Sequence, residues 1–235
     1  MVASARCLDN LKASGLEVSG IVDFELVDLL IEEMDKPYLT PVLAPANHDF
    51  TQENAFWLVA WNNEEPAMII GARLEPLGTE TVETYWKRTS RRHYPSGEGE
   101  TIETVAPEVN KDLRGKLAYI GDLFVQRTHR GIPDLLENFM LFAHATIGLK
   151  WDPDFTYAFM RNRDVRLGFA NRYGFTRHFP SARTWVNPPD GRSNSEWLVS
   201  LPRSDRNHVI RNVVASHDEL RIVQNEAVPR KVVNR

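Results

Sequence analysis

The sequence predicts an α/β (α+β) fold with one mixed, mostly antiparallel central sheet flanked by helices. Two apolar runs separated by a short polar break form a hairpin pattern. Farther along, an apolar strand is followed at once by a helix, and a second strand, a second helix and a last strand come after it. The 235 residues are enough for a single domain, 1–235, with a full core.

The first 55 residues are predicted to be a helical extension of that core. A helix is expected over Asp23–Lys36, because Pro37 cannot continue it. Its apolar residues recur on one face: Leu26, Leu30 and Met34. The segment 37–54 carries three prolines and is expected to be a loop.

The hairpin pairs Phe56–Trp61 with Ala67–Leu74 across the polar break Asn62–Glu65. Residues 77–116 are then expected to be an insertion between two strands of the sheet. This insertion holds a weakly amphipathic helix, Thr79–Arg92, and a flexible break, Ser96–Glu100.

The second half of the chain has the clearer pattern. Leu117–Val125 is predicted to be a buried strand, and a polar turn, Gln126–Arg130, leads from it into a helix at Asp134–Ile147. The later predicted elements are a strand at Phe155–Met160, a short helix at Asp164–Tyr173 stopped by Gly174, a strand at Glu196–Leu201 and a closing helix at Arg203–Ala215. The predicted core therefore spans 56–201, and 202–235 hold the closing helix and a tail.

Composition argues against several classes of partner. A net charge of −4 is unusual for a nucleic-acid-binding protein, and no apolar run approaches the roughly 20 residues that cross a bilayer. Cys7, the single cysteine, cannot form an internal disulfide, and no apolar leader segment is seen, so a cytoplasmic protein is expected. There is no zinc-ligand spacing and no G-x-S-x-G nucleophile motif, so no metal is expected.

The turn after the strand 117–125 suits an anion. The first N–H groups of a helix are unpaired and carry a partial positive charge, and Gly131 lets a phosphate approach the backbone. Arg127 and Arg130 add positive charge, and Pro133 fits a first helical turn. An ordinary strand-to-helix connection with surface arginines is the alternative.

Here the chain resembles the GNAT acyltransferase superfamily, whose phosphate signature is V-x-P-x-x-R-G-x-G-x-G. Placing Val125 first puts Arg130 and Gly131 on the R-G pair, whereas Pro133 and Leu135 replace the later glycines. A shorter alignment instead puts Gly131 on the central glycine.

A second motif and the hairpin extend this resemblance over about 56–201. The family often has N-x-x-A followed by F-Y-x-x-L-G-F, and this chain has Asn162 followed by F-A-N-R-Y-G-F over Phe169–Phe175. Ala170 stands where the family commonly has a tyrosine that acts as general acid. The hairpin, with Gly71 late in its second strand, is similar to the family's second and third strands.

The resemblance implies a GNAT-like sheet whose fourth and fifth strands splay apart to admit acetyl-CoA or another acyl-CoA as co-substrate. The pantetheine arm would pair with the fourth strand near Phe124 and Val125. The residues expected to bind CoA are Phe124, Val125, Arg127, Arg130, Gly131, Ile132, Pro133 and Asn162.

Two residues are candidates for the chemistry of amine acylation. Asp122 is the only acid in the strand 117–125, and strand alternation puts it on the same face as Phe124. A desolvated carboxylate there could act as the base, or it could cap a turn or pair with an arginine. Tyr173 could protonate the leaving thiolate in place of the missing tyrosine at Ala170, or it could pack in the core.

The expected function is acyl transfer from CoA to an amine of an acceptor that the sequence does not identify. One alternative is a non-catalytic acyl-CoA-binding or protein-interaction module, which Ala170 and the lost glycines favour. A second is an enzyme similar to acyl-homoserine-lactone synthases, suggested by Gly71–Leu77 and the insertion after it. Dimers are common for this fold, so a homodimer is an open alternative.

Overall fold

The computed structural model describes residues 2–95 and 99–212. Its strands are β1 (Glu17–Ile21), β2 (Ala55–Asn62), β3 (Glu65–Pro76), β4 (Ile102–Val105), β5 (Lys116–Val125), β6 (Phe155–Met160), β7 (Arg177–Pro180), β8 (Arg183–Trp185) and β9 (Trp197–Pro202). Its helices are α1 (Val2–Ala13), α2 (Glu25–Glu33), α3 (Val82–His93), α4 (Pro107–Asp112), α5 (Leu135–Trp151), α6 (Asn162–Arg166) and α7 (Phe169–Arg172), and residues 203–212 are also helical.

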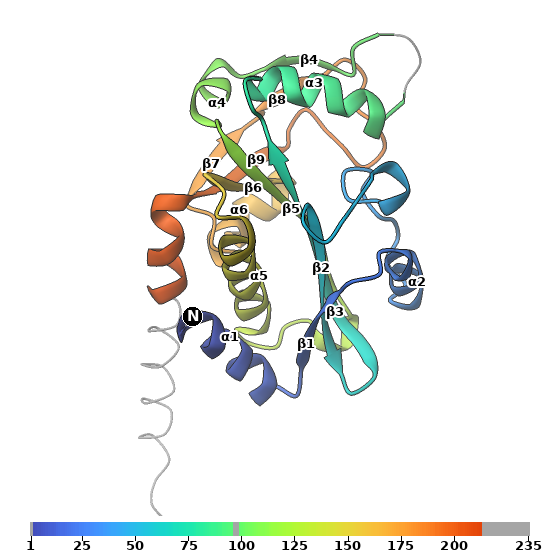
Figure 1. The fold of residues 1–235 in the computed structure, drawn as a ribbon, viewed down its shortest axis with the longest axis vertical. Coiled ribbons are helices and arrows are strands. Elements are labelled where there is room, and N and C mark those ends of the chain that lie inside the picture. Colours follow the sequence, from blue (N-terminus) through green and yellow to red (C-terminus); the bar gives the residue numbers. More distant parts are fainter. Residues whose placement is uncertain (1, 96–98, 213–235) are drawn as a thin grey trace, which may run out of the picture.

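Seven of these strands form one sheet in the order β1-β2-β3-β5-β6-β9-β7, and β4 and β8 form a separate two-stranded sheet. Within the large sheet only β5 and β6 are parallel neighbours, and every other pair is antiparallel. The predicted mixed, mostly antiparallel sheet flanked by helices is therefore confirmed (Figure 1).

Helices cover both faces of the sheet and bury a core on each side. The core on one face contains residues from α1, α5 and α7, and the core on the other face contains residues from α2, α3 and α4 (Figure 1). The sheet thus lies in the middle layer, and any opening between two of its strands leads toward both cores.

The predicted hairpin is confirmed as β2 and β3, which pair antiparallel along their length. Gly71 lies opposite Trp57, a fully buried tryptophan. A Cβ on residue 71 would lie 2.8 Å from the Trp57 indole ring, so only glycine leaves room for that side chain.

Several predicted elements differ from the structure at their ends or in their packing. Leu30 and Met34 of the predicted apolar face are buried, but Leu26 is exposed, and Val27 and Ile31 complete the buried face of α2. The helix in the insertion is clearly amphipathic, because Tyr85 and Trp86 make its buried face together with Val82, Ser90 and His93. That face is made mainly of aromatic and histidine side chains. The spacing of aliphatic residues in the sequence therefore does not reveal it.

Other elements were missing from the prediction. β1 forms an edge of the large sheet, within the segment expected to be helical, and β4, β7 and β8 are strands of three or four residues. The single helix predicted over Asp164–Tyr173 is broken into α6 and α7, because Gly168 between them has φ +82°. The closing helix is present over 203–212, and its predicted last three residues and Ser96–Glu98 lie outside the described residues.

The parallel strands β5 and β6 separate after a short stretch of pairing. They pair only at Leu117–Phe155, Ala118–Thr156 and Tyr119–Tyr157. In chain order these are the fourth and fifth strands of the large sheet, so the predicted splay is confirmed.

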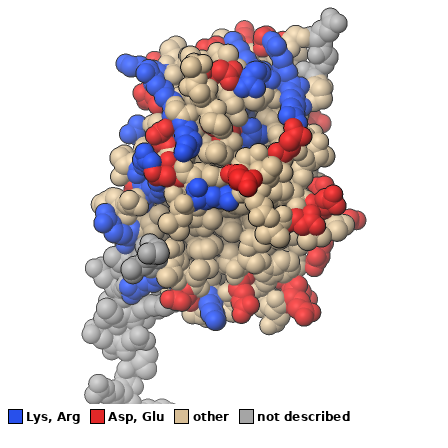
Figure 2. Space-filling model, viewed as in Figure 1, with Lys and Arg blue, Asp and Glu red and all other residues tan. Residues whose placement is uncertain are grey.

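Charge is distributed unevenly over the surface. Figure 2 shows acidic side chains gathered at the right of the molecule, where Figure 1 places α2. The acids of α2 are all exposed: Glu25, Asp28, Glu32 and Glu33. They form the solvated face of an amphipathic helix. Over residues 2–95 and 99–212, no helix combines the length and the apolar character needed to cross a membrane.

Candidate active site

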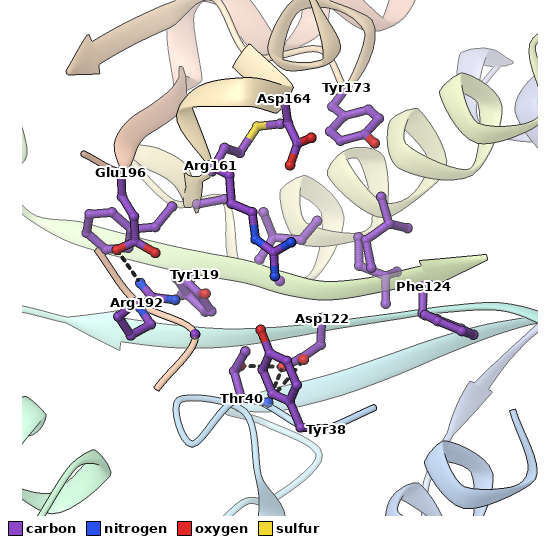
Figure 3. Close-up of a pocket in the computed structure, with 18 of the residues that line it drawn as sticks. Tyr38, Thr40, Tyr119, Asp122, Phe124, Arg161, Asp164, Tyr173, Arg192 and Glu196 are labelled. Carbon is purple, nitrogen blue, oxygen red and sulfur yellow. Dashed lines mark hydrogen bonds and ion pairs between the residues drawn. The ribbon is translucent and has the colours of Figure 1, made fainter. Parts of the chain in front are cut away.

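Two cavities meet where β5 and β6 separate. The first cavity, about 420 Å³, lies between the second half of β5, the end of β6 and the loops 36–40 and 191–196 (Figure 3). The second cavity, about 470 Å³, lies beside the turn that follows β5. Leu123, Phe124 and Tyr173 line both, so the two cavities are neighbouring parts of one cleft.

A β-bulge shapes the β5 wall of this cleft. Gly71 pairs with Gly121 and Ile69 pairs with Phe124, so one residue of β3 lies opposite two residues of β5. Asp122, inside the bulge, has φ +56°. The bulge interrupts the simple alternation that predicted the direction of Asp122, although its carboxylate and Phe124 both pack toward the α2 side of the sheet.

The Asp122 carboxylate is buried and fully engaged. Its side chain is 1% exposed, and Oδ1 lies 2.7 Å from Nζ of Lys36, which follows α2. The backbone N–H of Thr40 donates to both carboxylate oxygens at 3.1 and 3.2 Å, and the Thr40 hydroxyl also donates to Oδ2. Asp122 lines the first cavity, but these contacts are those of an anchor for the loop 36–40.

Tyr173 lies at the junction of the two cavities. Its hydroxyl has no hydrogen-bond partner among the described residues, and Figure 3 shows the ring near Asp164 of α6. Burial, and next the negative charge of Asp164, raises the pKa of Tyr173 to about 12. The phenol therefore stays protonated at neutral pH and is able to donate a hydrogen bond or a proton into the cleft.

Ala170 lies away from the cleft. It is buried in the core that α5 shares with the sheet, and it lines neither cavity. A tyrosine there would have to displace core side chains, whereas Tyr173, three residues later on the next turn, faces the cleft.

The turn after β5 forms one wall of the second cavity. Six of the residues predicted to bind CoA line it: Phe124, Val125, Arg130, Gly131, Ile132 and Pro133. The Arg130 guanidinium donates from Nε to the Val125 carbonyl at 2.9 Å and lies 5.6 Å from the centre of the Phe124 ring. Gly131 has φ +80°, and among the described residues no atom lies within 4 Å of the position a Cβ would take.

The start of α5 differs from the expected phosphate turn. Pro133 was expected in the first helical turn, but it precedes Asp134, which occupies the N-cap position of α5 with φ +59° and makes no side-chain capping hydrogen bond. The helix begins at Leu135 and carries Glu137 in its first turn. Two carboxylates near a helix N-terminus oppose an anion, so the backbone dipole alone does not define this site.

Arg172 supplies a cation that sequence reasoning missed. It lines the second cavity and donates from Nε to Glu137 Oε1 at 2.5 Å. The second Glu137 oxygen, Oε2, is buried and has no hydrogen-bond partner among the described residues. Arg172 is the R of F-A-N-R-Y-G-F, so its place beside Tyr173 in that motif was the available signal.

Two predicted CoA ligands are not brought to either cavity. Arg127 is exposed in a 3-10 turn and lines neither. The Asn162 amide oxygen accepts hydrogen bonds from Trp197 Nε1 at 3.0 Å and from Arg166 Nε at 3.1 Å, which ties α6 to β9. Their roles in binding CoA stay predictions.

The far end of the first cavity contains charged residues that the sequence did not single out. Arg192 and Glu196 come from the loop between β8 and β9 and face Tyr119 of β5 (Figure 3). Asp164 and Arg161 lie at the β6 side of the same cavity. Across the described part of the chain, no group of three or more His, Cys, Asp or Glu residues is placed to hold a metal ion.

Neither a protein-family model nor a curated protein matches the chain. Among solved structures it is similar to an aminoglycoside N(6′)-acetyltransferase from Legionella pneumophila, with 12% identity over 83% of this chain and 95% of that one and a TM-score of 0.43. An uncharacterized protein from Bacillus halodurans matches with 10% identity over 86% and 91% and a TM-score of 0.49.

A third similar structure is Arabidopsis thaliana NAA60 in complex with acetyl-CoA, with 16% identity over 80% and 98% of the two chains and a TM-score of 0.41. All three TM-scores lie below 0.5. The fold therefore rests on the strand order, register and splay of this chain itself.

Proposed function

We propose that this chain is an acyl-CoA-dependent N-acyltransferase that moves an acyl group from CoA to an amine. The observation that carries the proposal is the continuity of the two cavities through Leu123, Phe124 and Tyr173, at the gap between β5 and β6. CoA would enter along the second cavity, and the thioester would reach the junction. The amine acceptor would occupy the first cavity.

The gap also supports the expected contact between the pantetheine arm and β5. After Tyr119, no strand of the described residues pairs with β5 on its β6 side. A pantetheine arm carries amide groups that can pair with such an unpartnered strand edge, so Phe124 and Val125 remain its proposed neighbours. The pyrophosphate would lie near Arg130, Gly131 and Arg172, with Ile132 and Pro133 on the outer rim.

In the proposed reaction the neutral amine nitrogen attacks the thioester carbon, the C–S bond breaks, and one proton moves in total from nitrogen to sulfur. Tyr173, which lines the cavity and stays protonated, would donate a hydrogen bond or proton to the sulfur as it leaves. Positioning of the two substrates in one cleft would supply much of the rate enhancement.

The role that we propose for Asp122 differs from the catalytic base predicted from the sequence. Its role as the base stays a prediction, and the contacts with Lys36 and Thr40 weigh against it, because both carboxylate oxygens already accept hydrogen bonds. We propose that Asp122 holds the loop 36–40 in place as a wall of the acceptor cavity.

Thermal unfolding in the presence of CoA and acyl-CoA tests the proposal without presuming an acceptor. A ligand at about 100 times its dissociation constant stabilises the native state by about 2.7 kcal/mol, which for a chain of this size raises Tm by roughly 5–11 °C. We expect this shift with CoA, acetyl-CoA, succinyl-CoA or octanoyl-CoA. A folded protein with no shift in any of them would remove the proposed function.

A non-catalytic protein-interaction module that does not bind CoA is the second candidate, and the acids at the start of α5 favour it because they oppose a bound pyrophosphate. Release of CoA from acetyl-CoA in the presence of a pool of amines separates the two. An enzyme shows release that depends on the amine, and a module shows none.

A further inference from the structure

A buried cluster of charges closes the inner end of the first cavity. Arg192 Nη2 lies 3.2 Å from Glu196 Oε2, and Nη2 of Arg183, on β8, lies 3.7 Å from the same oxygen. The three side chains are only 7–8% exposed. Arg192 and Glu196 line the cavity, whereas Arg183 lies behind them against aromatic rings.

The cluster carries an excess of positive charge. Two guanidinium groups share one carboxylate, which leaves a formal charge of +1. The other charged residues that line the cavity offset one another in sign: Lys36 and Asp122 on one wall, and Arg161 and Asp164 on the other. Burial, and next the charge of Arg192, lowers the pKa of Arg183 to about 10, so Arg183 is still charged at neutral pH.

Hydrogen bonding in the cluster is incomplete. The two ion pairs to Glu196 Oε2 do not have hydrogen-bond geometry: among the described residues, Nε and Nη2 of both arginines, Arg183 and Arg192, make no hydrogen bond, and neither does Glu196 Oε2. Buried charged donors without acceptors are costly, and in folded proteins they are expected to find a partner. The side chain of Arg192 lines the cavity and is 8% exposed, so its guanidinium is the cation of the cluster that a ligand there can contact, although its Nε and Nη2 atoms are themselves buried (Figure 3).

Aromatic side chains hold the guanidinium groups in place. The Arg183 guanidinium carbon lies 3.6 Å from the centre of the Phe159 ring and 4.3 Å from that of Trp185, and Arg192 lies 5.5 Å from Phe159. The Tyr119 hydroxyl lies beside Arg192. A stacked, fixed guanidinium presents parallel N–H donors, the arrangement that matches the two oxygens of a carboxylate.

We propose that Arg192 binds a carboxylate of the molecule that occupies the first cavity, so that the N-acylated product of this protein carries a carboxylate group. The inference rests on the proposed function, because an N-acylated product requires acyl transfer to an amine. It deepens that function by naming the chemical class of the product. The carboxylate could belong to the acceptor, as in an amino acid, or to the end of a dicarboxylic acyl chain on CoA. Both would place the negative charge at Arg192 and the reacting groups near Tyr173.

Direct binding of matched charged and neutral ligands tests the carboxylate site without a measurement of activity. The probes are a panel of N-acetyl amino acids, each compared by calorimetry with its amide, which keeps the shape and removes the charge. Succinyl-CoA and butyryl-CoA form the second pair, in which the acyl chain either carries or lacks a carboxylate. We expect the charged member of at least one pair to bind about 10- to 150-fold more tightly, the range for hydrogen bonds to charged groups.

Replacing the arginine should remove this preference selectively. Arg192→Met leaves one cation facing Glu196, so the buried charges stay balanced, and the charged and neutral members of the pair should then bind alike. Arg192→Lys keeps the positive charge but lacks the planar guanidinium with its parallel N–H donors. It should retain part of the preference for the charged ligand. Arg177→Met, an exposed arginine on β7 that lines neither cavity of the cleft, should behave as wild type.

The outcomes separate this inference from the proposed function. A preference in the amino-acid pairs identifies the acceptor as the source, and a preference in the succinyl–butyryl pair identifies the acyl chain. Equal binding of charged and neutral members in wild type, with CoA binding intact, would overturn the carboxylate site and leave the function standing. Binding of the carboxylate without any binding of CoA would overturn the proposed function and leave the carboxylate site standing. If Arg192→Met does not fold, the Arg192→Lys comparison decides.

Discussion

Lys36 Nζ lies 2.7 Å from Oδ1 of Asp122, which joins the end of α2 to the bulge of β5 across the sheet face. Lys36 also donates to the carbonyl of Tyr38, so one ammonium group fixes both the strand and the loop that lies over the first cavity. The N-terminal segment therefore contributes a wall of the site. Variants of this pair distinguish two roles for Asp122, because loss of an anchor lowers stability whereas loss of a base lowers turnover.

If Asp122 is an anchor, Asp122→Asn and Lys36→Met should each lower the free energy of unfolding by about 3 kcal/mol or more, because each leaves a buried group without its partner. The double variant should recover much of this loss. Chemical denaturation of the three variants measures it. A base would behave differently: Asp122→Asn would keep its stability and lose roughly 100-fold in turnover, while Lys36→Met would keep turnover.

Tyr173→Phe should lower kcat by about 100-fold with little change in KM, because it removes a proton donor and keeps the ring. Burial and the charge of Asp164 raise the pKa of Tyr173 to about 12, so this phenol stays protonated as pH rises through the neutral and mildly alkaline range. Wild-type kcat should therefore show no alkaline fall from this group below about pH 11. A variant with wild-type kcat would leave Tyr173 a packing residue.

Arg130→Ala should weaken CoA binding by about 1.5–3 kcal/mol, the scale of a hydrogen bond to a charged group. Gly131→Ala should also weaken it, at a cost in stability of about 1 kcal/mol, because residue 131 has φ +80°. Calorimetric titration with CoA checks both, and Arg114→Ala, an exposed arginine away from the cleft, is the control. Unchanged affinity in both variants would place the pyrophosphate elsewhere.

Stability should fall as pH falls below about 6.5, in part through His144. Burial lowers the pKa of this histidine to about 4, so between pH 6.5 and 4 the unfolded chain binds a proton that the native chain does not. At pH 5 this amounts to about 2 kcal/mol.

The measurement is the loss of unfolding free energy between pH 7 and pH 5. His144→Gln should lose about 2 kcal/mol less than wild type over this range, whereas the exposed His208→Gln should lose as much as wild type. Equal losses in all three proteins would contradict the assignment.

Sequence reasoning found the elements that are rich in apolar residues. The hairpin β2–β3, the strand β5 and the helix α5 each bury a long run of mostly apolar side chains, and such runs are visible in a sequence. β1 was missed because its five residues are mostly exposed and include a glycine. It becomes a strand through pairing with β2, which is a tertiary effect.

The site was predictable only where it follows a motif. Arg130 and Gly131 come from the strand-to-helix turn, and both line the second cavity. Arg192 and Glu196 lie in a loop without periodicity, and their proximity to Tyr119 exists only after β9 has joined the sheet. The partner of Asp122 was equally invisible, because Lys36 is 86 residues away in sequence.

The small sheet of β4 and β8 separates two tasks within one cleft. β8 holds the loop that carries Arg192, since the Trp185 backbone N–H donates to the Asn194 side chain at 2.7 Å, and β4 of the insertion holds β8 in turn. The turn that carries Arg130 belongs to neither the β3–β5 nor the β4–β8 strand pairing. Changes in the insertion 77–116 would therefore act on the support of Arg192 and leave the turn at Arg130 unchanged, so the two ends of the cleft are free to evolve independently.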